Sequence, residues 1–320
     1  AAIDLPTAAS PLPQAPPSVA ADVAGVSSFY TPNADFYRID TALDVPQVPA
    51  ETWRLRIHGM VEREIELSYA DLVDRGVVEE DITLTCVSNT VGGQLVGTAR
   101  WLGVPLGDLL ADAGVDPAAD QLVGRSVDGY TCGFPISDID GRPALVAVGM
   151  NGEPLPLEHG FPARLIVSGL YGYVSATKWL TEIEVTTFDA FDQYWVRRGW
   201  DEQAPIKTMA RIDTPRTLGR VSAGTVAVGG VAWAQTRGIS RVEISIDDAE
   251  FVDATLADEL NVHTWRQWSY AWQDATPGRH RITVRATDGD GDLQTPDRAD
   301  PFPNGASGWM SILVDVEEAA

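Results

Sequence analysis

Helix signals in this 320-residue sequence stop near residue 206, and only strand signals follow. Before that point, SYADLVDRG (68–76) begins with a serine suited to capping a helix, and PLGDLLADAG (105–114) runs from a proline to a glycine, as short helices do. After it, short β-patterned runs are separated by DD, PG and DGDG turns. The sequence therefore predicts an α+β domain over residues 29–205 and an immunoglobulin-like β-sandwich over 206–320.

Residues 1–28 differ from both predicted domains because they are rich in alanine and proline and poor in bulky apolar side chains. Such a composition predicts an extended linker. A segment of this kind often follows a removed signal or a membrane anchor, so we expect an extracytoplasmic protein, exported or anchored, with the cytoplasm as the alternative. No apolar run in the sequence approaches the roughly 20 residues that a membrane helix needs.

The net charge limits the partners of this chain. The sequence has 46 acidic and 23 basic residues, giving a formal net charge of −23. This balance repels nucleic acid and anionic membrane surfaces, so we expect no nucleic-acid function. It also makes any cluster of cationic side chains informative, because an anionic ligand needs such a cluster to overcome the field.

One of the two cysteines stands where a predicted strand ends. In TLTCVSNTVGG (83–93), Cys86 follows a β-branched run and precedes polar and glycine positions. The residues alone leave three interpretations open. Cys86 forms a disulfide with Cys132 in a non-catalytic binding module, it is a buried thiol, or it is the nucleophile of a cysteine hydrolase with partners such as His159 and Asn89.

An aspartate-rich turn in the second domain resembles the start of a calcium-binding loop. ATDGDGDLQ (286–294) places aspartates at 288, 290 and 292, but Leu293 and Ala299 stand where such a loop needs glycine and a bidentate glutamate. We therefore expect a solvated hairpin turn.

The segment NGEPLPLEHGFPARLIVSGLYGYVSATKWL (151–180) concentrates turns and cationic groups. It carries His159, Arg164, Ser175 and Lys178 among many glycines and prolines. An imidazole, a guanidinium, a hydroxyl and an ammonium on exposed turns suit a phosphate cradle. The alternative is that Arg164 and Lys178 pair with surplus carboxylates.

Three motifs in order, TLTCVSN, TARWLGVPLGDLL and VGMNGEPLPLEHGFPARLIVSGLYGYVSATKWLTEIEV, strongly resemble the sulfite oxidase family of molybdopterin-dependent oxidoreductases. The resemblance runs from about Phe29 to the C-terminus, because the second domain is similar to the dimerisation domain of that family. It implies a molybdenum–molybdopterin cofactor, a sulfite oxidase-type first domain and a homodimer.

The resemblance also implies roles for individual residues. Cys86 is the thiolate that binds molybdenum, a soft ligand for a metal already held by a dithiolene. Ten positions are expected at the site: Asp35, Phe36, Tyr37 and Ser126 on the cofactor, with His159, Arg164, Ser175 and Lys178 around its pterin and phosphate, and Arg38 and Trp200 as catalytic positions beside Cys86. Cys132 matches no ligand position.

Two departures from the family pattern concern the substrate. Sulfite-oxidising members carry an arginine where this chain has Val91 and a tyrosine where it has Trp200. Valine cannot replace the fork of donors that an arginine offers to a small oxyanion. Four basic residues could rebuild an anion pocket: Arg38, Arg197, Arg198 and Lys207. The alternative for the Arg197–Arg198 pair is a set of domain-interface salt bridges.

The expected reaction is two-electron oxygen-atom transfer, sulfite oxidase- or dehydrogenase-like. The alternative is reduction of an S-oxide, N-oxide or nitrate on the same cofactor. The sequence shows no C-x-x-C-H haem site, so we expect electrons to pass to or from a separate carrier such as a cytochrome.

Overall fold

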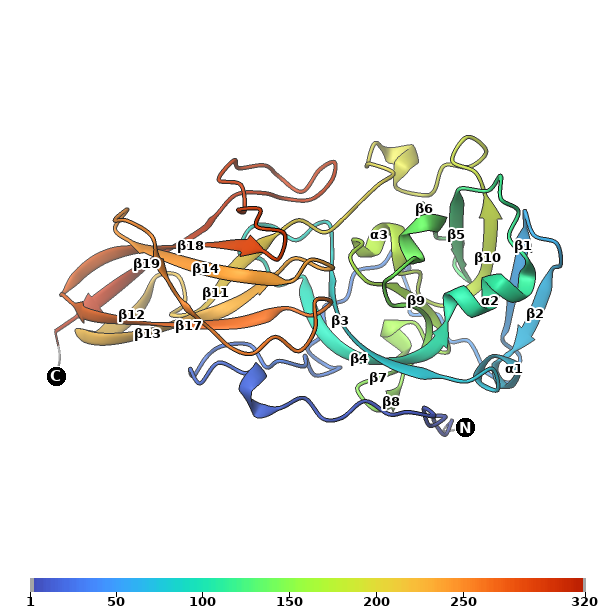
Figure 1. Ribbon diagram of the computed structural model, residues 1–320, viewed down its shortest axis with the longest axis horizontal. Helices are drawn as coiled ribbons and strands as arrows, with labels where there is room; N and C mark the ends of the chain where they lie inside the picture. The colour runs from blue at the N-terminus through green and yellow to red at the C-terminus, as the bar shows by residue number, and fades with distance from the viewer. Residues whose placement is uncertain (1–2, 319–320) are drawn as a thin grey trace. The chain divides into compact units, whose positions relative to one another are not determined.

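The computed structural model describes residues 3–318 and divides into two compact units (Figure 1). The first unit contains the described residues up to 13, 32–87 and 99–205, and the second contains 14–31, 88–98 and those from 206 onward. Most of the regular structure is β, with three short α-helices in the first unit. No helix in the described part of the chain is long and apolar enough to cross a membrane.

The two helices expected from the sequence are present. Helix α1 (Tyr69–Val73) begins after Ser68, whose side chain accepts from the Asp71 backbone N–H while the Asp71 carboxylate accepts from Ser68 N–H. This reciprocal pair satisfies two donors that a helix start leaves open. Helix α2 (Leu106–Ala113) ends at Gly114, which has the left-handed conformation common at helix ends. The third helix is α3 (Gly172–Ser175).

Two five-stranded sheets build the first unit. In one sheet the order is β2 (Ile65–Ser68), β1 (Arg54–Gly59), β10 (Leu180–Thr186), β5 (Gln121–Ser126) and β6 (Thr131–Pro135). The other contains β3 (Val78–Thr85), β4 (Val96–Pro105), β7 (Ala144–Met150) and β8 (Glu153–Pro154), with β9 (Arg164–Val167) also paired to β7. The 3₁₀ turns of this unit are η2 (Ile136–Ile139), η3 (Leu157–His159) and η4 (Val196–Arg198).

A cluster of buried side chains holds the sheet that contains β3 and β4 next to the cavity described below. Trp101 on β4 is fully buried and contacts the ring of Phe36 edge-on, with centroids 5.8 Å apart. Leu84 on β3 and Ala176 belong to the same cluster, and Tyr37 packs against it. Because interiors are close-packed, this cluster holds the end of β3 and residues 36–37 in fixed positions.

The second unit is a two-sheet β-sandwich. One sheet runs in the order β11 (Met209–Thr214), β13 (Gly224–Trp233), β17 (Arg266–Ala275) and β16 (Thr255–Leu256). The other runs β12 (Gly219–Ser222), β19 (Met310–Glu317), β18 (Gly278–Asp288), β14 (Ile239–Ile246) and β15 (Val252–Asp253). Buried side chains from both sheets form one core, including Val228, Trp268, Val242 and Ile282. The α+β-then-sandwich fold class is thus confirmed, while the immunoglobulin-like assignment stays a prediction.

The turn after β18 is structured by its own aspartate. The Asp288 carboxylate accepts from Arg237 (2.8 Å), Thr208 (3.1 Å) and the backbone N–H groups of Asp290 and Asp292. Two of these four donors belong to the turn and two come from other segments, and the Asp288 side chain is buried rather than solvated. No group of three or more potential metal-binding His, Cys, Asp or Glu side chains occurs among residues 3–318.

The predicted N-terminal linker needs correction. The described residues from 3 to 28 are mostly extended, with one 3₁₀ turn, η1 (Pro17–Val19), but they are anchored along their length. In the first unit Leu12 N–H donates to Glu79 (2.7 Å), and in the second the Gln267 amide bonds both Ala21 N–H and the Ser27 carbonyl. Side chains of the folded body satisfy the backbone groups that an extended chain leaves unpaired. Composition does not reveal such partners.

Candidate functional site

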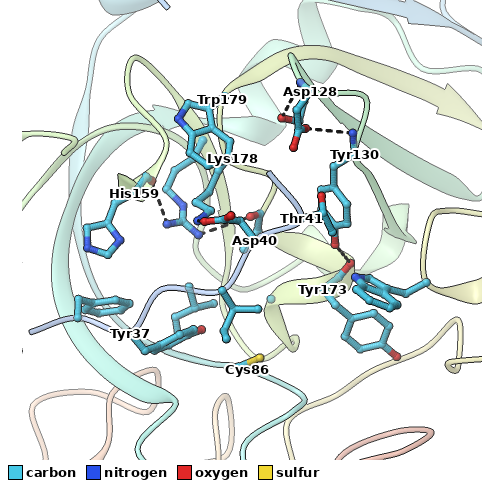
Figure 2. Close-up of a pocket in the computed structure, with 18 residues that line it drawn as sticks. Tyr37, Asp40, Thr41, Cys86, Asp128, Tyr130, His159, Tyr173, Lys178 and Trp179 are labelled. Atoms are coloured by element: carbon cyan, nitrogen blue, oxygen red, sulfur yellow. Dashed lines mark hydrogen bonds and ion pairs between the residues drawn. The ribbon is translucent and has the colours of Figure 1, made fainter. Parts of the chain in front are cut away.

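A single cavity of the first unit gathers most of the predicted site residues (Figure 2). It encloses about 750 Å³ of space between atoms, part of it open to solvent. Seven predicted site residues line it: Phe36, Tyr37, Cys86, Ser126, His159, Arg164 and Lys178. These residues come from segments up to about 140 positions apart, so the fold brings them together.

Cys86 follows the last residue of β3, so the strand fixes where its sulfur enters the cavity. The residue is 7% exposed and its sulfur forms no disulfide. In Figure 2 it lies apart from Lys178 and Asp128, and Tyr37 is its labelled neighbour. A thiol held rigidly at a cavity wall is suited to bind a soft metal once deprotonated.

Arg164 is a buried cation with spare hydrogen-bonding capacity. It begins β9, is 4% exposed, and donates to the carbonyls of His159 (3.1 Å) and Ala176 (3.5 Å). Its guanidinium lies 5.3 Å from the ring centroid of Trp101. The Nε atom is buried without a partner. Burial lowers the pKa of Arg164 to about 10, so the group stays charged near neutral pH.

His159 is engaged by the early segment of the chain. Its Nε2 donates to the Asn33 carbonyl at 3.0 Å, because a carbonyl oxygen only accepts. The ring meets Phe36 edge-on, with centroids 5.7 Å apart. Burial, followed by the charge of Arg164, lowers the pKa of His159 below its ordinary value. The imidazole is therefore neutral near pH 7, with Nδ1 as its unprotonated nitrogen.

Lys178 pairs with a carboxylate that the sequence analysis did not name. Its Nζ donates to Asp40 Oδ2 (2.8 Å) and to the Glu158 carbonyl (3.1 Å), and lies 4.7 Å from the Trp179 ring centroid. Burial is the main reason that the pKa of Lys178 falls to about 8. Burial opposes ionisation of Asp40 too, but hydrogen bonds from Lys178 and Arg38 hold the Asp40 pKa below its ordinary value.

Four predicted site residues lie outside the cavity lining. Asp35 is exposed, and Arg38 is a largely exposed partner of Asp40 (2.9 Å). Ser175 is buried, and its hydroxyl donates to the carbonyls of Leu170 and Tyr171, which directly precede α3. Trp200 packs against the rings of Tyr173 (5.7 Å) and Trp195 (6.2 Å). The side chains that the sequence placed beside the cofactor here face solvent, backbone or other rings.

Several lining residues were missed by sequence reasoning. They are Ile39, Asp40, Thr41, Leu84, Asp128, Tyr130, Gly172, Tyr173, Ala176, Trp179 and Trp195. Asp40, Thr41 and Trp179 adjoin motifs that were singled out, so extending those motifs by a few positions would have found them. Tyr130 and Trp195 lie in the same segments as the predicted Ser126 and Trp200, but only the fold shows that their side chains reach the cavity.

The paired arginines of η4 lie against aromatic rings and backbone carbonyls of the first unit. Arg198 stacks 3.6 Å from the Tyr194 ring centroid and Arg197 lies 5.2 Å from that of Phe191. Each donates to a nearby backbone carbonyl. Lys207, in the second unit, bonds the Asn304 side chain and the Gly305 carbonyl. None of the three lines the cavity.

The disulfide interpretation is wrong, because neither Cys86 nor Cys132 forms a disulfide. Cys132, on β6, is fully buried and lies 2.5 Å from the Thr177 hydroxyl. Burial raises the pKa of its thiol to about 11. Asn89, the amide suggested for a cysteine hydrolase, accepts from Leu95 N–H within the second unit. The geometry thus offers a metal-binding thiol rather than a disulfide or an assembled hydrolase triad.

Comparison with known proteins identifies the fold and the family. The oxidoreductase molybdopterin binding domain family matches residues 42–195. The "Uncharacterized oxidoreductase YuiH" of Bacillus subtilis is 33% identical over 162 residues, covering 49% of this chain and 77% of that protein. The chain belongs to the sulfite oxidase family of molybdopterin-dependent oxidoreductases.

Two further relatives extend this family membership beyond the first unit. Mitochondrial sulfite oxidase of Homo sapiens is 28% identical over 326 residues, 87% of this chain. The chain spans only 59% of the length of that relative. The crystal structure of the sulfane dehydrogenase SoxCD from Paracoccus pantotrophus covers 92% of this chain and 85% of its own, with a TM-score of 0.79 at 20% identity. This likeness shows that both units share its fold.

The cavity residues fit the family's molybdenum–molybdopterin cofactor. The Cys86 thiol, which follows β3 and forms no disulfide, would supply a metal ligand, and the buried, unpartnered Nε of Arg164 would supply a donor for an anionic group. Buried polar atoms normally have partners, so an orphaned guanidinium nitrogen in a cavity indicates an absent ligand. Lys178 adds a second cation to the lining of the same cavity.

Proposed function

We propose that this chain catalyses two-electron oxygen-atom transfer to or from a small sulfur or nitrogen compound, with Cys86 as the protein ligand of molybdenum. The observation that carries the proposal is that one cavity joins the Cys86 thiol to two buried cations, Arg164 and Lys178. When bound, the cofactor supplies the metal centre that exchanges oxygen and electrons. The protein supplies position and charge.

Each residue of the cavity has a distinct task in this proposal. Arg164 and Lys178 bind the anionic end of the cofactor, and the ring of Trp101 beneath Arg164 keeps its guanidinium from moving. Cys86 at the end of β3 holds the metal end. Because the residues that bind the two ends of the cofactor lie on buried, packed elements, the reacting centre is held in one place relative to the aromatic side chains that line the cavity.

The charge distribution favours a neutral S-oxide or N-oxide over sulfite as the substrate. Of the described residues that line the cavity, only Arg164 and Lys178 are positively charged near pH 7, and both are needed by the cofactor anion. The lining also includes the carboxylates of Asp40 and Asp128. A sulfite anion would be desolvated there without a cation of its own, which is unfavourable. Sulfite oxidation is the runner-up because it is the reaction named for the family's curated relatives.

Reduction of the substrate requires electrons from a source outside this protein. Reduction of an S-oxide consumes two electrons and two protons and releases the sulfide and water. We propose that a separate one-electron carrier such as a cytochrome supplies the electrons. A homodimeric assembly and an extracytoplasmic location remain part of the proposal and rest on the resemblance and on the composition of residues 1–28.

The test begins with protein made in a molybdenum-replete host. Elemental mass spectrometry and fluorescence of the oxidised pterin should give about one molybdenum and one pterin per chain. Reduced viologen dye with dimethyl sulfoxide, trimethylamine N-oxide or nitrate, and an electron acceptor with sulfite, then measure both directions. Faster oxidation of sulfite than reduction of either oxide would overturn the substrate class.

The matched variants for this test are Cys86→Ser and Cys132→Ser. Replacement of Cys86 should abolish turnover while the fold, measured by circular dichroism, is retained. Replacement of Cys132, which the proposal gives no ligand role, should leave the molybdenum content near that of the parent protein. A fully active Cys86→Ser enzyme would show that the assignment of the metal ligand is wrong.

A further inference from the structure

Three tyrosines line the cavity, and the hydroxyl groups of two of them already donate hydrogen bonds to backbone carbonyls. The Tyr130 hydroxyl donates to the Tyr173 carbonyl at 2.8 Å, as Figure 2 shows. The Tyr173 hydroxyl donates to the Asp201 carbonyl at 2.6 Å. Each of these groups is held by the backbone, so neither is free to bind a ligand without losing a hydrogen bond.

The third hydroxyl, that of Tyr37, makes no hydrogen bond to any residue in the described part of the chain. The ring is fixed by stacking on Phe36, with centroids 5.3 Å apart and planes at 23°. Figure 2 shows the hydroxyl on the side of the ring toward Cys86. A rigid ring that presents an unused donor beside the candidate metal ligand is therefore available to a bound substrate.

The space in front of this hydroxyl is kept open by glycine. A Cβ added at Gly172 would lie 3.8 Å from the Tyr37 hydroxyl and 3.8 Å from a methyl of Leu84. Any larger side chain at 172 would extend from that position into the neighbourhood of the hydroxyl. The combination of a tyrosine donor and a glycine therefore leaves room for a small ligand group.

The Tyr37 phenol remains a donor throughout the neutral pH range. Burial raises its pKa well above the ordinary value, and the negative charge of Cys86 adds to this effect while Arg164 opposes it. A protonated phenol donates one hydrogen bond and suits a neutral, strongly polar acceptor oxygen.

We infer that the Tyr37 hydroxyl donates a hydrogen bond to the oxygen of the S-oxide or N-oxide substrate and thereby selects for this class. The inference rests on the proposed function. The S=O and N–O groups carry their negative charge on oxygen, and a donor there also stabilises the charge that grows on oxygen as its bond to sulfur or nitrogen breaks. The oxygen leaves as water with two protons and the two electrons from the carrier, and Tyr37 is unchanged.

The first variant is Tyr37→Phe, which removes only the hydroxyl. Its matched control is Tyr69→Phe, because the Tyr69 hydroxyl is also buried without a partner but lies on α1, outside the cavity lining. In the molybdenum-loaded enzyme, kcat/KM for dimethyl sulfoxide should fall about 100- to 1000-fold in Tyr37→Phe, as expected for one lost donor to a reacting oxygen. Tyr69→Phe should match the parent enzyme.

Two further measurements separate a substrate role from a cofactor role. Molybdenum content should be equal in both variants, and loss of molybdenum from Tyr37→Phe would overturn the inference in favour of a cofactor contact. Dimethyl sulfone, a neutral oxide that is not reduced, should bind loaded Tyr37→Phe about tenfold more weakly than Tyr69→Phe in calorimetry.

The sulfone titration also decides the inference if the parent enzyme reduces neither oxide. In that case the proposed function fails, yet weaker sulfone binding by Tyr37→Phe than by Tyr69→Phe would still support a hydrogen bond to an oxide oxygen. Equal binding by the two variants, or no binding by the parent protein, would overturn the inference.

Discussion

Lys178 Nζ lies 2.8 Å from Asp40 Oδ2, and each side chain is only 8% exposed. The ammonium that should meet the cofactor phosphate is thus already neutralised by a carboxylate from the segment after Arg38. Removing one partner of such a buried pair strongly destabilises the folded protein, because the other charge is left uncompensated. Asp40 therefore competes with any anion that approaches Lys178.

We expect Asp40→Asn to bind anions more tightly than the parent protein when no cofactor is present. Without the carboxylate, the unfolding free energy should fall by about 3 kcal/mol, since Lys178 is left buried and charged. Pyrophosphate should restore this loss and bind about tenfold more tightly than to the parent chain. Thermal unfolding with and without pyrophosphate measures both effects.

Asp128→Asn is the control for that comparison. Asp128 also lines the cavity, but it accepts from the Tyr130 backbone N–H rather than from a lysine. Its replacement should leave the stabilisation by pyrophosphate close to that of the parent chain. An equal gain in both variants would mean that the net charge of the cavity, and not the contact with Lys178, governs anion binding.

Anion binding should weaken as the pH rises through about 8. The folded-state pKa of Lys178 is lowered to about 8 from the ordinary 10.5 because the group is buried, despite the opposing bond from Asp40. Lys178 is therefore charged below that pH and loses its charge above it. Calorimetric titration of pyrophosphate at pH values from about 7 to 9 should show the affinity falling and proton uptake appearing.

The same shift has the opposite effect on stability. Since the unfolded chain holds the Lys178 proton up to a higher pH than the folded chain, the unfolding free energy should rise between about pH 8 and the ordinary lysine pKa of 10.5. In Lys178→Arg the charge persists across this range, so both pH dependences should flatten. An unchanged pH profile in that variant would assign the effect to another group.

The two thiols should differ sharply in reactivity in the folded, cofactor-free protein. Cys132 is fully buried with its pKa raised to about 11 by burial, whereas Cys86 is 7% exposed and lines the cavity. At pH 8 roughly a thousandth of Cys132 would be thiolate, which is the reactive form. Iodoacetamide should therefore label Cys86 first, as read by peptide mass spectrometry. Labelling of Cys132 at the same rate would mean that β6 opens readily.

Gly160 allows the close approach of the two cationic side chains. Its φ is +109°, and an added Cβ would lie 3.0 Å from Lys178 Cβ and 3.2 Å from Arg164 Cβ. Gly160→Ala should lower the unfolding free energy by more than the roughly 1–2 kcal/mol that a left-handed alanine costs. It should also weaken pyrophosphate binding, because Lys178 and Arg164 must move.

Gly152→Ala is the matched variant for this effect. Gly152 also has a positive φ, +79°, but an added Cβ meets nothing within 4 Å. Denaturant unfolding should show the backbone cost alone, with pyrophosphate affinity unchanged. If both variants lost the same stability and the same affinity, the close contact at Gly160 would have no role.

The sequence by itself determined the local elements and pointed to the candidate ligands. Ser68 and Gly114 mark helix ends through capping and left-handed backbone, effects that act within a few residues. The strand patterns and the loss of helix signals near residue 206 predicted the α+β unit and the sandwich. They could do so because side-chain alternation and turn preferences also depend only on neighbouring residues. Family motifs pointed to Cys86, Arg164 and Lys178, and the fold brings all three to one cavity.

Only the tertiary structure decided which neighbours complete the cavity. Asp40 reaches Lys178 across 138 positions, and Tyr130 and Trp195 line the cavity beside the predicted residues of other segments. It also turned Ser175 toward backbone carbonyls and Trp200 toward other rings. Side-chain direction depends on the packing of distant segments and on which polar groups need partners after burial, and a sequence pattern carries neither.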